Sequence, residues 1–446
     1  MYRFALEFLK KWANNLPHKP LIIRGARQVG KSTLVSIFAK AAKFDLLVLN
    51  FEKNPEFEKF FLSNNPAKII SLLETIFNKT IKAGSSLLFL DEIQAKPQVL
   101  SVLRYFYEEM PDLHIICAGS LLDFELNSPT FSMPVGRISY MHLHPMSFGE
   151  YLQAINKTKL SEFIINWHIK DEMPEPIHQA LMQNFKEYLV VGGMPEAVKT
   201  YVKSKSYQKT QIVKQDLLAT FNDDFAKYSL KNNYELIRLV FNKIPINIGN
   251  KVKYSNLSSQ NRAKDIATAV NQLANARVVN KVVHSSANGI PLQAQEKQKF
   301  YKLIFLDVGL VATMLNVDYL SLENGDLMMI NSGAIAEQWV GQALISNQDF
   351  NQKPYLNYWI REKKSSSAEL DYIISVGREI IGIEVKAGKT GTLRSLHQFM
   401  QEKNHKFAVR FNSEPPSLLK KPYILSLPLY LAEECRRLCL ELQKTQ

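Results

Sequence analysis

Gly25-Ala-Arg-Gln-Val-Gly-Lys-Ser32 is the stretch that decides the fold of the N-terminal part of this 446-residue chain. It matches the phosphate-loop pattern G-x-x-x-x-G-K-[ST] at every fixed position. The apolar run Leu21–Ile23 precedes it, and a stretch with helical spacing begins at Ser32. In such a loop, backbone N–H groups and the positive end of the following helix surround phosphate oxygens. The stretch therefore predicts a strand, a phosphate-binding loop and a helix in succession.

The loop residues have distinct expected roles toward ATP. Lys31 is expected to reach the β- and γ-phosphates, and the Ser32 hydroxyl is expected to ligate Mg²⁺. The residues predicted to bind ATP are Gly25, Gln28, Gly30, Lys31, Ser32 and Thr33.

Two carboxylates follow the apolar run Leu87–Leu90. Four apolar residues in a row indicate a strand buried on both faces, with Asp91 and Glu92 emerging at its carboxyl end. Asp91 is expected to hold Mg²⁺ through water, and Glu92 to act as general base on the attacking water.

Two further residues are candidates for the hydrolytic site. Ser120 follows the predicted strand Leu113–Ala118, where it would contact the γ-phosphate or simply occupy a turn. Arg137 precedes the predicted strand Ser139–Leu143. It would stabilise transition-state charge in its own or a neighbouring subunit, or is an ordinary surface arginine.

The spacing of apolar residues divides the chain into four predicted units. Residues 1–150 alternate short apolar runs with helical stretches and predict a doubly wound α/β core. Residues 151–225 predict a helical lid, with helices at Phe148–Ile155, Ile177–Val190 and Tyr207–Phe225. Residues 226–300 predict a small module, and residues 301–446 a second α/β domain.

The module 226–300 is strongly basic. It holds 12 basic and 3 acidic residues, a net charge of +9 out of +13 for the whole chain. A helix at Arg262–Ala276 and a hairpin of Val278–His284 with Ile290–Gln295 predict a winged helix. Arg262, Lys264 and Arg277 are the predicted DNA contacts, because concentrated positive charge favours a polyanion. The alternative is a helical linker with a solvated basic face.

A set of charged residues follows in the last unit. Leu370–Ser375 and Ile380–Lys386 predict a hairpin that brings Asp371 close to Glu384 and Lys386, and Glu337 lies on the preceding predicted helix. Carboxylates and a lysine in this pattern can hold a divalent metal and orient a water for attack on a phosphodiester. The alternative is a salt-bridged solvent face.

These motifs carry a resemblance to known families. Residues 1–225 resemble the AAA+ ATPases, and nearly the whole chain is similar to a bacterial and archaeal family that joins such an ATPase to a domain of unknown function, number 4143. The set Asp371, Glu384 and Lys386 resembles the PD-(D/E)XK, or restriction-endonuclease-like, nuclease fold. The chain departs from the family in having Ser32 for threonine and Val308 for the threonine of an aspartate-threonine-glycine motif. The motifs that carry the family resemblance are the phosphate loop, Leu90-Asp-Glu-Ile-Gln94, Ala118-Gly-Ser-Leu121, Gly136-Arg137, His144-Pro-Met-Ser-Phe148, Gly192-Gly-Met-Pro-Glu196 and Phe305-Leu-Asp-Val-Gly-Leu310.

Composition excludes several classes of protein. Three cysteines do not make a disulfide framework, and charges interrupt every apolar run before it could span a membrane. The prediction is therefore a cytoplasmic ATPase that uses ATP and Mg²⁺, assembles as a homo-oligomer, and binds and processes DNA or another nucleic acid. The alternative is a nucleotide-switched binding or signalling protein whose nuclease-like domain is inactive. A metabolic kinase is disfavoured, because the Asp91–Glu92 pair and a helical lid suit hydrolysis and motion.

Overall fold

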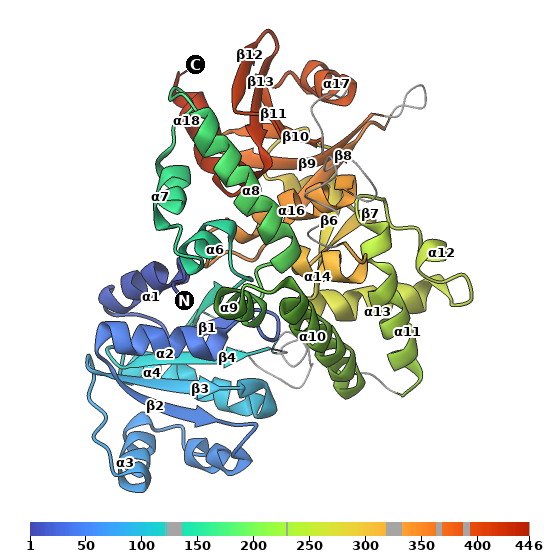
Figure 1. Cartoon of the computed structure of the whole chain (residues 1–446). Coiled ribbons are helices and arrows are strands. Elements are labelled where there is room, and N and C mark those ends of the chain that lie inside the picture. The colour runs from blue at the N-terminus through green and yellow to red at the C-terminus, as the bar shows by residue number, and fades with distance from the viewer. Residues whose placement is uncertain are drawn as a thin grey trace.

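The computed structural model describes residues 1–120, 122, 136–228, 231–317, 332–362, 368–386 and 393–445. A sheet with its helices forms the N-terminal part, at the bottom of Figure 1, and a larger sheet forms the C-terminal part at the top. The helices that lie between the two sheets in sequence are placed between and beside the sheets, from the left of the molecule to its right (Figure 1). None of the helices in the described ranges is long and apolar enough to cross a membrane.

The N-terminal sheet has five strands in the order β2-β3-β4-β1-β5, and all its pairings are parallel. The predicted apolar runs are confirmed as strands. Their bounds are β1 (Leu21–Arg24), β2 (Asp45–Asn50), β3 (Ser86–Asp91), β4 (His114–Gly119) and β5 (Ser139–His142).

Both faces of this sheet are covered, which explains why its strands are continuously apolar. Leu87 and Phe89 of β3 share a core with α1 (Ala5–Asn14) and α2 (Lys31–Ala42). Leu88 and Leu90 point to the opposite face and pack with α3 (Pro66–Phe77) and α4 (Leu103–Glu109). The sheet is therefore held between two apolar layers, with its carboxyl edge left for polar residues.

The predicted helical segment after the sheet is also confirmed as helical. Its helices are α6 (Phe148–Ala154), α7 (Thr158–Asn166), α8 (Glu175–Val191), α9 (Pro195–Ser204) and α10 (Tyr207–Tyr228). At the start of α6, Ser147 and Glu150 form a reciprocal capping box, which fixes where that helix begins. The long α8 reaches from the neighbourhood of α9 toward the C-terminal sheet (Figure 1).

The predicted basic module is only partly as expected. Helices α11 (Lys231–Lys243), α12 (Tyr254–Leu257) and α13 (Ala263–Asn275) are present. The prediction of a second hairpin strand at Ile290–Gln295 is wrong, because Leu292–Gln295 is a short 3-10 helix. Strand β6 (Val279–Ser285) instead pairs antiparallel with β7 (Glu296–Phe305).

Strands β6 and β7 belong to the C-terminal sheet, and β7 runs across residue 300, where a domain boundary was expected. Strand β7 is an edge strand, and most of its first half is solvent-exposed. That half therefore lacks the apolar residues from which a strand is recognised in sequence.

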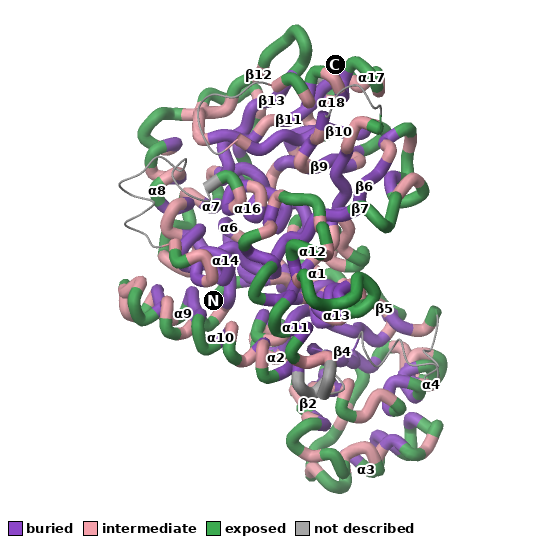
Figure 2. The backbone as a smooth tube through the Cα atoms, turned by 90° about the vertical axis from the view of Figure 1, so that its right-hand side faces the viewer, coloured by how far each residue is buried: buried purple, intermediate pink, exposed green. Residues whose placement is uncertain are grey.

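The C-terminal sheet has eight strands in the order β12-β13-β11-β10-β9-β8-β6-β7. Helices α16 (Ser332–Ser346) and α18 (Cys435–Thr445) cover one face and α17 (Arg394–Lys403) the other. Figure 2 shows the central strands β9 to β11 as mostly buried. The remaining elements are β8 (Leu356–Ile360), β9 (Glu369–Val376), β10 (Glu379–Val385), β11 (Phe407–Asn412), β12 (Ser417–Lys420), β13 (Tyr423–Pro428) and α14 (Val308–Met314).

Candidate functional site

The phosphate loop joins β1 to α2. Gly30 has the left-handed φ of 91° and immediately precedes α2, so a residue without a Cβ suits this position. The buried Lys31 side chain donates from Nζ to the carbonyls of Gly25 at 3.1 Å and Ala26 at 2.9 Å. Burial lowers the pKa of Lys31 to about 8, although Glu92 and Asp91 act in the opposite direction. The ammonium group of Lys31 is thus bonded to carbonyl groups of the loop itself.

Ser32 and Asp91 meet at the carboxyl edge of the sheet. The Ser32 hydroxyl lies 3.1 Å from Oδ1 and 3.0 Å from Oδ2 of Asp91. Asn50, which pairs with Asp91 across β2 and β3, donates its amide to Oδ2 at 3.3 Å. Burial and then the negative charge of Glu92 raise the pKa of Asp91. A hydroxyl and a carboxylate side by side are ligands that Mg²⁺ takes together with phosphate and water, so these residues fit the ion.

Glu92 is held by a residue that the sequence did not single out as a site residue. Its backbone is left-handed, with a φ of 51°, and Oε2 accepts a hydrogen bond of 2.6 Å from Gln94 Nε2. The Gln94 amide lies against Gly119, where any side chain would collide with it. Ser120 follows as a buried residue, while Leu121 of the same motif lies outside the described residues. The ends of β3 and β4 therefore meet where Gln94, bonded to Glu92, lies against Gly119, the residue before Ser120.

Arg137 lies elsewhere on the N-terminal part. Its Nε donates to Glu108 Oε1 at 2.9 Å, near the end of α4, and its side chain is 44% exposed. Hydrogen bonds from Arg137 and Arg104 lower the pKa of Glu108. These contacts place Arg137 on the surface beside α4 and not in contact with the phosphate loop.

The three predicted DNA contacts do not share one surface. Arg262 and Lys264 are exposed at the beginning of α13. Arg277 follows the other end of that helix and donates from Nη1 to His142 Nδ1 at 2.9 Å. His142 ends β5, so Arg277 faces the N-terminal sheet. Arg277 is separated from Arg262 and Lys264 because it lies in the turn after α13, where the chain turns into β6.

A cavity of about 280 Å³ adjoins the loop. Arg3 lines it and donates from Nη1 to the carbonyl of Val29 at 3.0 Å. The sequence offered no sign of this contact, because Arg3 lies far upstream of the motif. The cavity lies between the phosphate loop, α2 and the first turns of α9. Its other lining residues include Gln28, Gly30, Thr33, Ile37, Pro195 and Lys199.

Two of the motifs that carry the family resemblance are in direct contact. Gly193 donates its backbone N–H to Asp307 Oδ2 at 2.6 Å, and a side chain at Gly192 would collide with Asp307. Pro195, two residues further on, lies close to Gly30 of the phosphate loop. The segment before α9 thus touches the phosphate loop on one side and the start of α14 on the other.

The C-terminal charged set gathers around a lysine that the sequence did not single out. Lys302 on β7 is buried, and its Nζ lies 3.0 Å from Glu337, 2.9 Å from Glu369 and 3.7 Å from Asp371. Burial alone would lower the pKa of Lys302, but the surrounding carboxylates raise it well above its usual value. The predicted hairpin does bring Asp371 to β10, where Oδ2 accepts the Val385 N–H at 2.7 Å.

The last two members of the set pair with each other. Lys386 Nζ lies 2.6 Å from Glu384 Oε1, while Glu384 Oε2 is buried without a hydrogen-bond partner. Burial and the charge of Asp371 raise the pKa of Glu384 to about 7. Burial and Asp371 likewise raise that of Glu337 to about 7.

A divalent metal does not fit this arrangement. The Lys302 ammonium already lies among Glu337, Glu369 and Asp371, where it supplies their positive charge. Within the described ranges, no group of three or more histidine, cysteine or acidic side chains is placed to hold a metal ion. The carboxylates are consequently satisfied by an ion pair of the chain itself.

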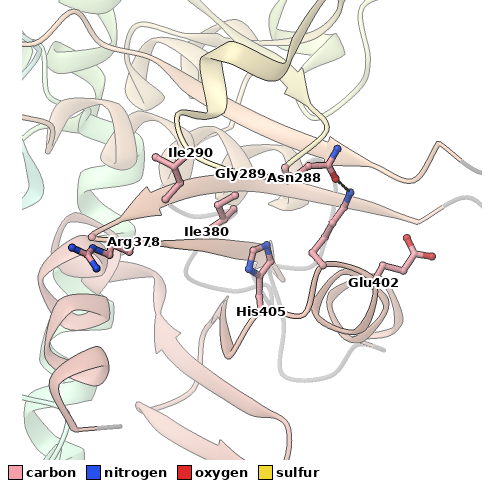
Figure 3. A pocket seen from close by; sticks show the side chains of 10 residues that line it. Asn288, Gly289, Ile290, Arg378, Ile380, Glu402 and His405 are labelled. Carbon is pink, nitrogen blue, oxygen red and sulfur yellow. Dashed lines mark hydrogen bonds between the residues drawn. The ribbon is translucent and has the colours of Figure 1, made fainter.

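Another cavity, of about 460 Å³, lies in the C-terminal part (Figure 3). It opens between the connection from β6 to β7, the turn between β9 and β10, and the end of α17. Asn288 accepts a hydrogen bond of 2.5 Å from Lys403 at its wall. None of the predicted site residues lines this cavity.

Three family models match the chain in succession. Residues 17–152 match an AAA domain, residues 182–321 match a domain of unknown function (DUF8612), and residues 332–430 match a domain of unknown function (DUF4143). The AAA match supports nucleotide binding and hydrolysis by the N-terminal part. No curated protein matches the chain.

Two solved structures show a weak likeness. The Walker-type ATPase PABY2304 of Pyrococcus abyssi is 13% identical, with a TM-score of 0.44, over 69% of this chain and 94% of that chain. PCH-2 of C. elegans is 13% identical, with a TM-score of 0.29, over 48% of this chain and 67% of that one. At these TM-scores neither likeness adds to the assignment. The N-terminal part of this chain is therefore similar to AAA domains, and its C-terminal part is similar to a domain of unknown function (DUF4143).

Proposed function

We propose that the protein hydrolyses ATP in a Mg²⁺-dependent reaction at the carboxyl edge of the N-terminal sheet. The contact between Ser32 and Asp91, at 3.0 and 3.1 Å, is the observation that carries this proposal. Ser32 and Asp91 would hold Mg²⁺, which when bound neutralises charge on the phosphate oxygens. Lys31 would leave the carbonyls of Gly25 and Ala26 to contact the β- and γ-phosphates. Glu92 would take a proton from the attacking water once released by Gln94.

ATP turnover in the presence and absence of Mg²⁺ tests this proposal. Lys31→Ala is expected to lose ATP binding, because its buried ammonium is the group expected to contact the β- and γ-phosphates. Glu92→Gln is expected to bind ATP normally and to lose about 10²–10⁴-fold in kcat, the usual worth of a general base. Wild-type protein that binds no MgATP in calorimetry, although well folded, would overturn the proposal.

We further propose that ATP turnover is coupled to nucleic-acid binding. The support is the net charge of +9 in residues 226–300 together with the exposed beginning of α13, where Arg262 and Lys264 lie. Thr268 and Asn271 are also exposed on α13 and offer hydrogen-bonding groups to a nucleic acid. Backbone phosphate contacts are the expected mode of binding, since they depend on charge and not on sequence.

DNA affinity measured over a range of salt concentrations tests the coupling. The DNA affinity is expected to fall steeply as the salt concentration rises. The loss of one phosphate contact in Arg262→Ala or Lys264→Ala should reduce the slope of log affinity against log salt concentration by about one. ATP turnover is expected to change when DNA is added. Absence of DNA binding at low salt would contradict the proposal and favour an acidic protein partner for this surface.

A nucleotide-switched binding protein with an inactive nuclease-like domain is the second candidate. The position of Lys302 among Glu337, Glu369 and Asp371 favours it, because the metal needed for cleavage has no place there. Incubation of DNA with Mg²⁺ or Mn²⁺ separates the two candidates. Cleavage by the wild type that is lost in Asp371→Ala and Lys386→Ala would support the hypothesis of an active nuclease. Absence of cleavage would support the hypothesis of a nucleotide-switched binding protein.

Arg137 retains a proposed role only toward a neighbouring subunit. Its exposed position beside α4 suits a surface that meets a second copy, and an arginine supplied in this way can stabilise transition-state charge. Turnover per subunit that rises with protein concentration, and no longer does so in Arg137→Ala, is the expected result. Turnover independent of concentration would remove Arg137 from the mechanism.

A further inference from the structure

Arg277 occupies a backbone position that an arginine does not favour. It follows the last turn of α13 with a φ of 59°, and Val278 N donates to the carbonyl of Leu273 at 3.1 Å to close the helix. This left-handed position after a helix is commonly glycine, and a residue with a Cβ is strained there by about 1 kcal/mol. An arginine kept at such a position points to a use for its side chain.

The side chain of Arg277 crosses from the α13 region to the N-terminal sheet. Its Nη1 lies 2.9 Å from His142 Nδ1. A guanidinium can only donate, so Nδ1 accepts and the His142 proton is on Nε2. Burial and then the charge of Arg277 lower the pKa of His142 to about 2, so the ring is neutral. This hydrogen bond therefore fixes the guanidinium against the end of β5.

His142 lies beside the start of the phosphate loop. It pairs with Arg24, the last residue of β1, and Leu143 donates its N–H to the carbonyl of Arg24 at 2.7 Å. The carbonyl of Leu143 lies so close to Gly25 that no side chain would fit there. Arg277 is also near enough to Lys31 for its charge to contribute to the lowered pKa of that lysine. Its guanidinium is thus held at the edge where the triphosphate would lie.

We propose that Arg277 contacts the phosphates of bound ATP and stabilises the charge that develops during hydrolysis. In the structure, the segment between the two sheets supplies this arginine, and its side chain is hydrogen-bonded to His142. This assignment rests on the proposed ATPase function. Since Arg262 and Lys264 lie at the other end of the same helix, α13 connects the proposed nucleic-acid surface to the ATP site. Rigid displacement of α13 by DNA would then move Arg277 relative to the phosphates.

Turnover and thermal unfolding of full-length variants test the assignment. Arg277→Gly removes the strained backbone position together with the hydrogen bond to His142, so the two effects on stability oppose each other and its Tm is expected to stay close to that of wild type, while kcat falls by at least about 10²-fold. Lys43→Gly is the matched control. Lys43 is exposed, has a φ of 57° after α2, and loses the same charge at the far end of that helix. Its turnover is expected to be unchanged.

Arg277→Gln is the second variant, and it tests the role of Arg277 in hydrolysis if Arg277→Gly folds poorly. Its amide keeps a donor for His142 but lacks the charge, so kcat is again expected to fall by at least about 10²-fold. Turnover within about twofold of wild type in a folded Arg277→Gly or Arg277→Gln protein would overturn this assignment alone. Wild-type protein without ATP turnover would overturn the proposed ATPase function and the assignment with it.

Discussion

Gly193 donates its backbone N–H to the buried carboxylate of Asp307 at 2.6 Å, which joins the segment before α9 to the segment before α14. Asp307 also accepts the Leu310 N–H at 3.1 Å and so caps α14. Because Pro195 lies against Gly30, one short segment connects the phosphate loop to the C-terminal part. A ligand that moves the loop therefore acts on a contact between two parts of the fold.

Replacing Asp307 by asparagine is expected to lower the free energy of unfolding by about 1–3 kcal/mol. The amide can accept only with its single oxygen, so one of the two buried N–H groups loses its acceptor. Urea unfolding measures the change. Asp216→Asn on the exposed side of α10 is the control and is expected to stay within about 0.5 kcal/mol of wild type. Equal stability of both variants would contradict this account.

The affinity for MgATP is expected to fall as the pH rises above about 8. Burial lowers the pKa of Lys31 to about 8, so the free protein loses the ammonium above this pH. Binding to the triphosphate requires the charged form, and the loss approaches about tenfold per pH unit. Titration with a fluorescent ATP analogue between pH 7.5 and 9.5 measures it. Lys31→Met should bind weakly at every pH, and a wild-type profile parallel to it would count against this role of Lys31.

Lys302→Met is expected to destabilise the protein by about 3–5 kcal/mol at pH 8, because buried carboxylates lose their cation. The loss should shrink toward pH 5, since the raised pKa of Glu337, about 7, lets that group protonate. Unfolding in denaturant at both pH values measures this. Lys297→Met removes an exposed ion pair from the same strand and should cost less than about 1 kcal/mol. Equal effects of both variants would rule out a special role for Lys302.

Glu384→Gln is expected to stabilise the protein at pH 8. Burial and Asp371 raise the pKa of Glu384 to about 7 from 4.5, so its contribution to stability is present below pH 4.5 and is lost as the pH rises through 7. Removing the charge should recover up to about 3 kcal/mol at pH 8 and almost nothing at pH 4.5. Glu379→Gln, at a partly exposed ion pair with Lys406, is the control. A less stable Glu384→Gln protein at pH 8 would show that the charge is needed.

The sequence alone was enough to predict that Ser32 and Asp91 meet at the carboxyl edge of the N-terminal sheet. The glycines, the lysine and the serine of the loop are consecutive, and Asp91 and Glu92 follow directly on an apolar strand. Parallel strands end at the same edge of a sheet, so these residues had to meet. The hairpin that carries Asp371 and Glu384 was equally local, because a turn of two residues sets its register.

Tertiary structure decided the rest, since the deciding contacts join residues far apart in the chain. Lys302 is 35 positions from Glu337 and reaches it only because β7 joins the C-terminal sheet as its edge strand. Arg277 is 135 positions from His142, and the direction of its side chain depends on a left-handed turn after α13. Local patterns report helices, strands and loops through nearest-neighbour sterics and periodic burial. They do not predict which charged residue from a distant part of the chain will lie at a site, because this position depends on how the elements pack against one another.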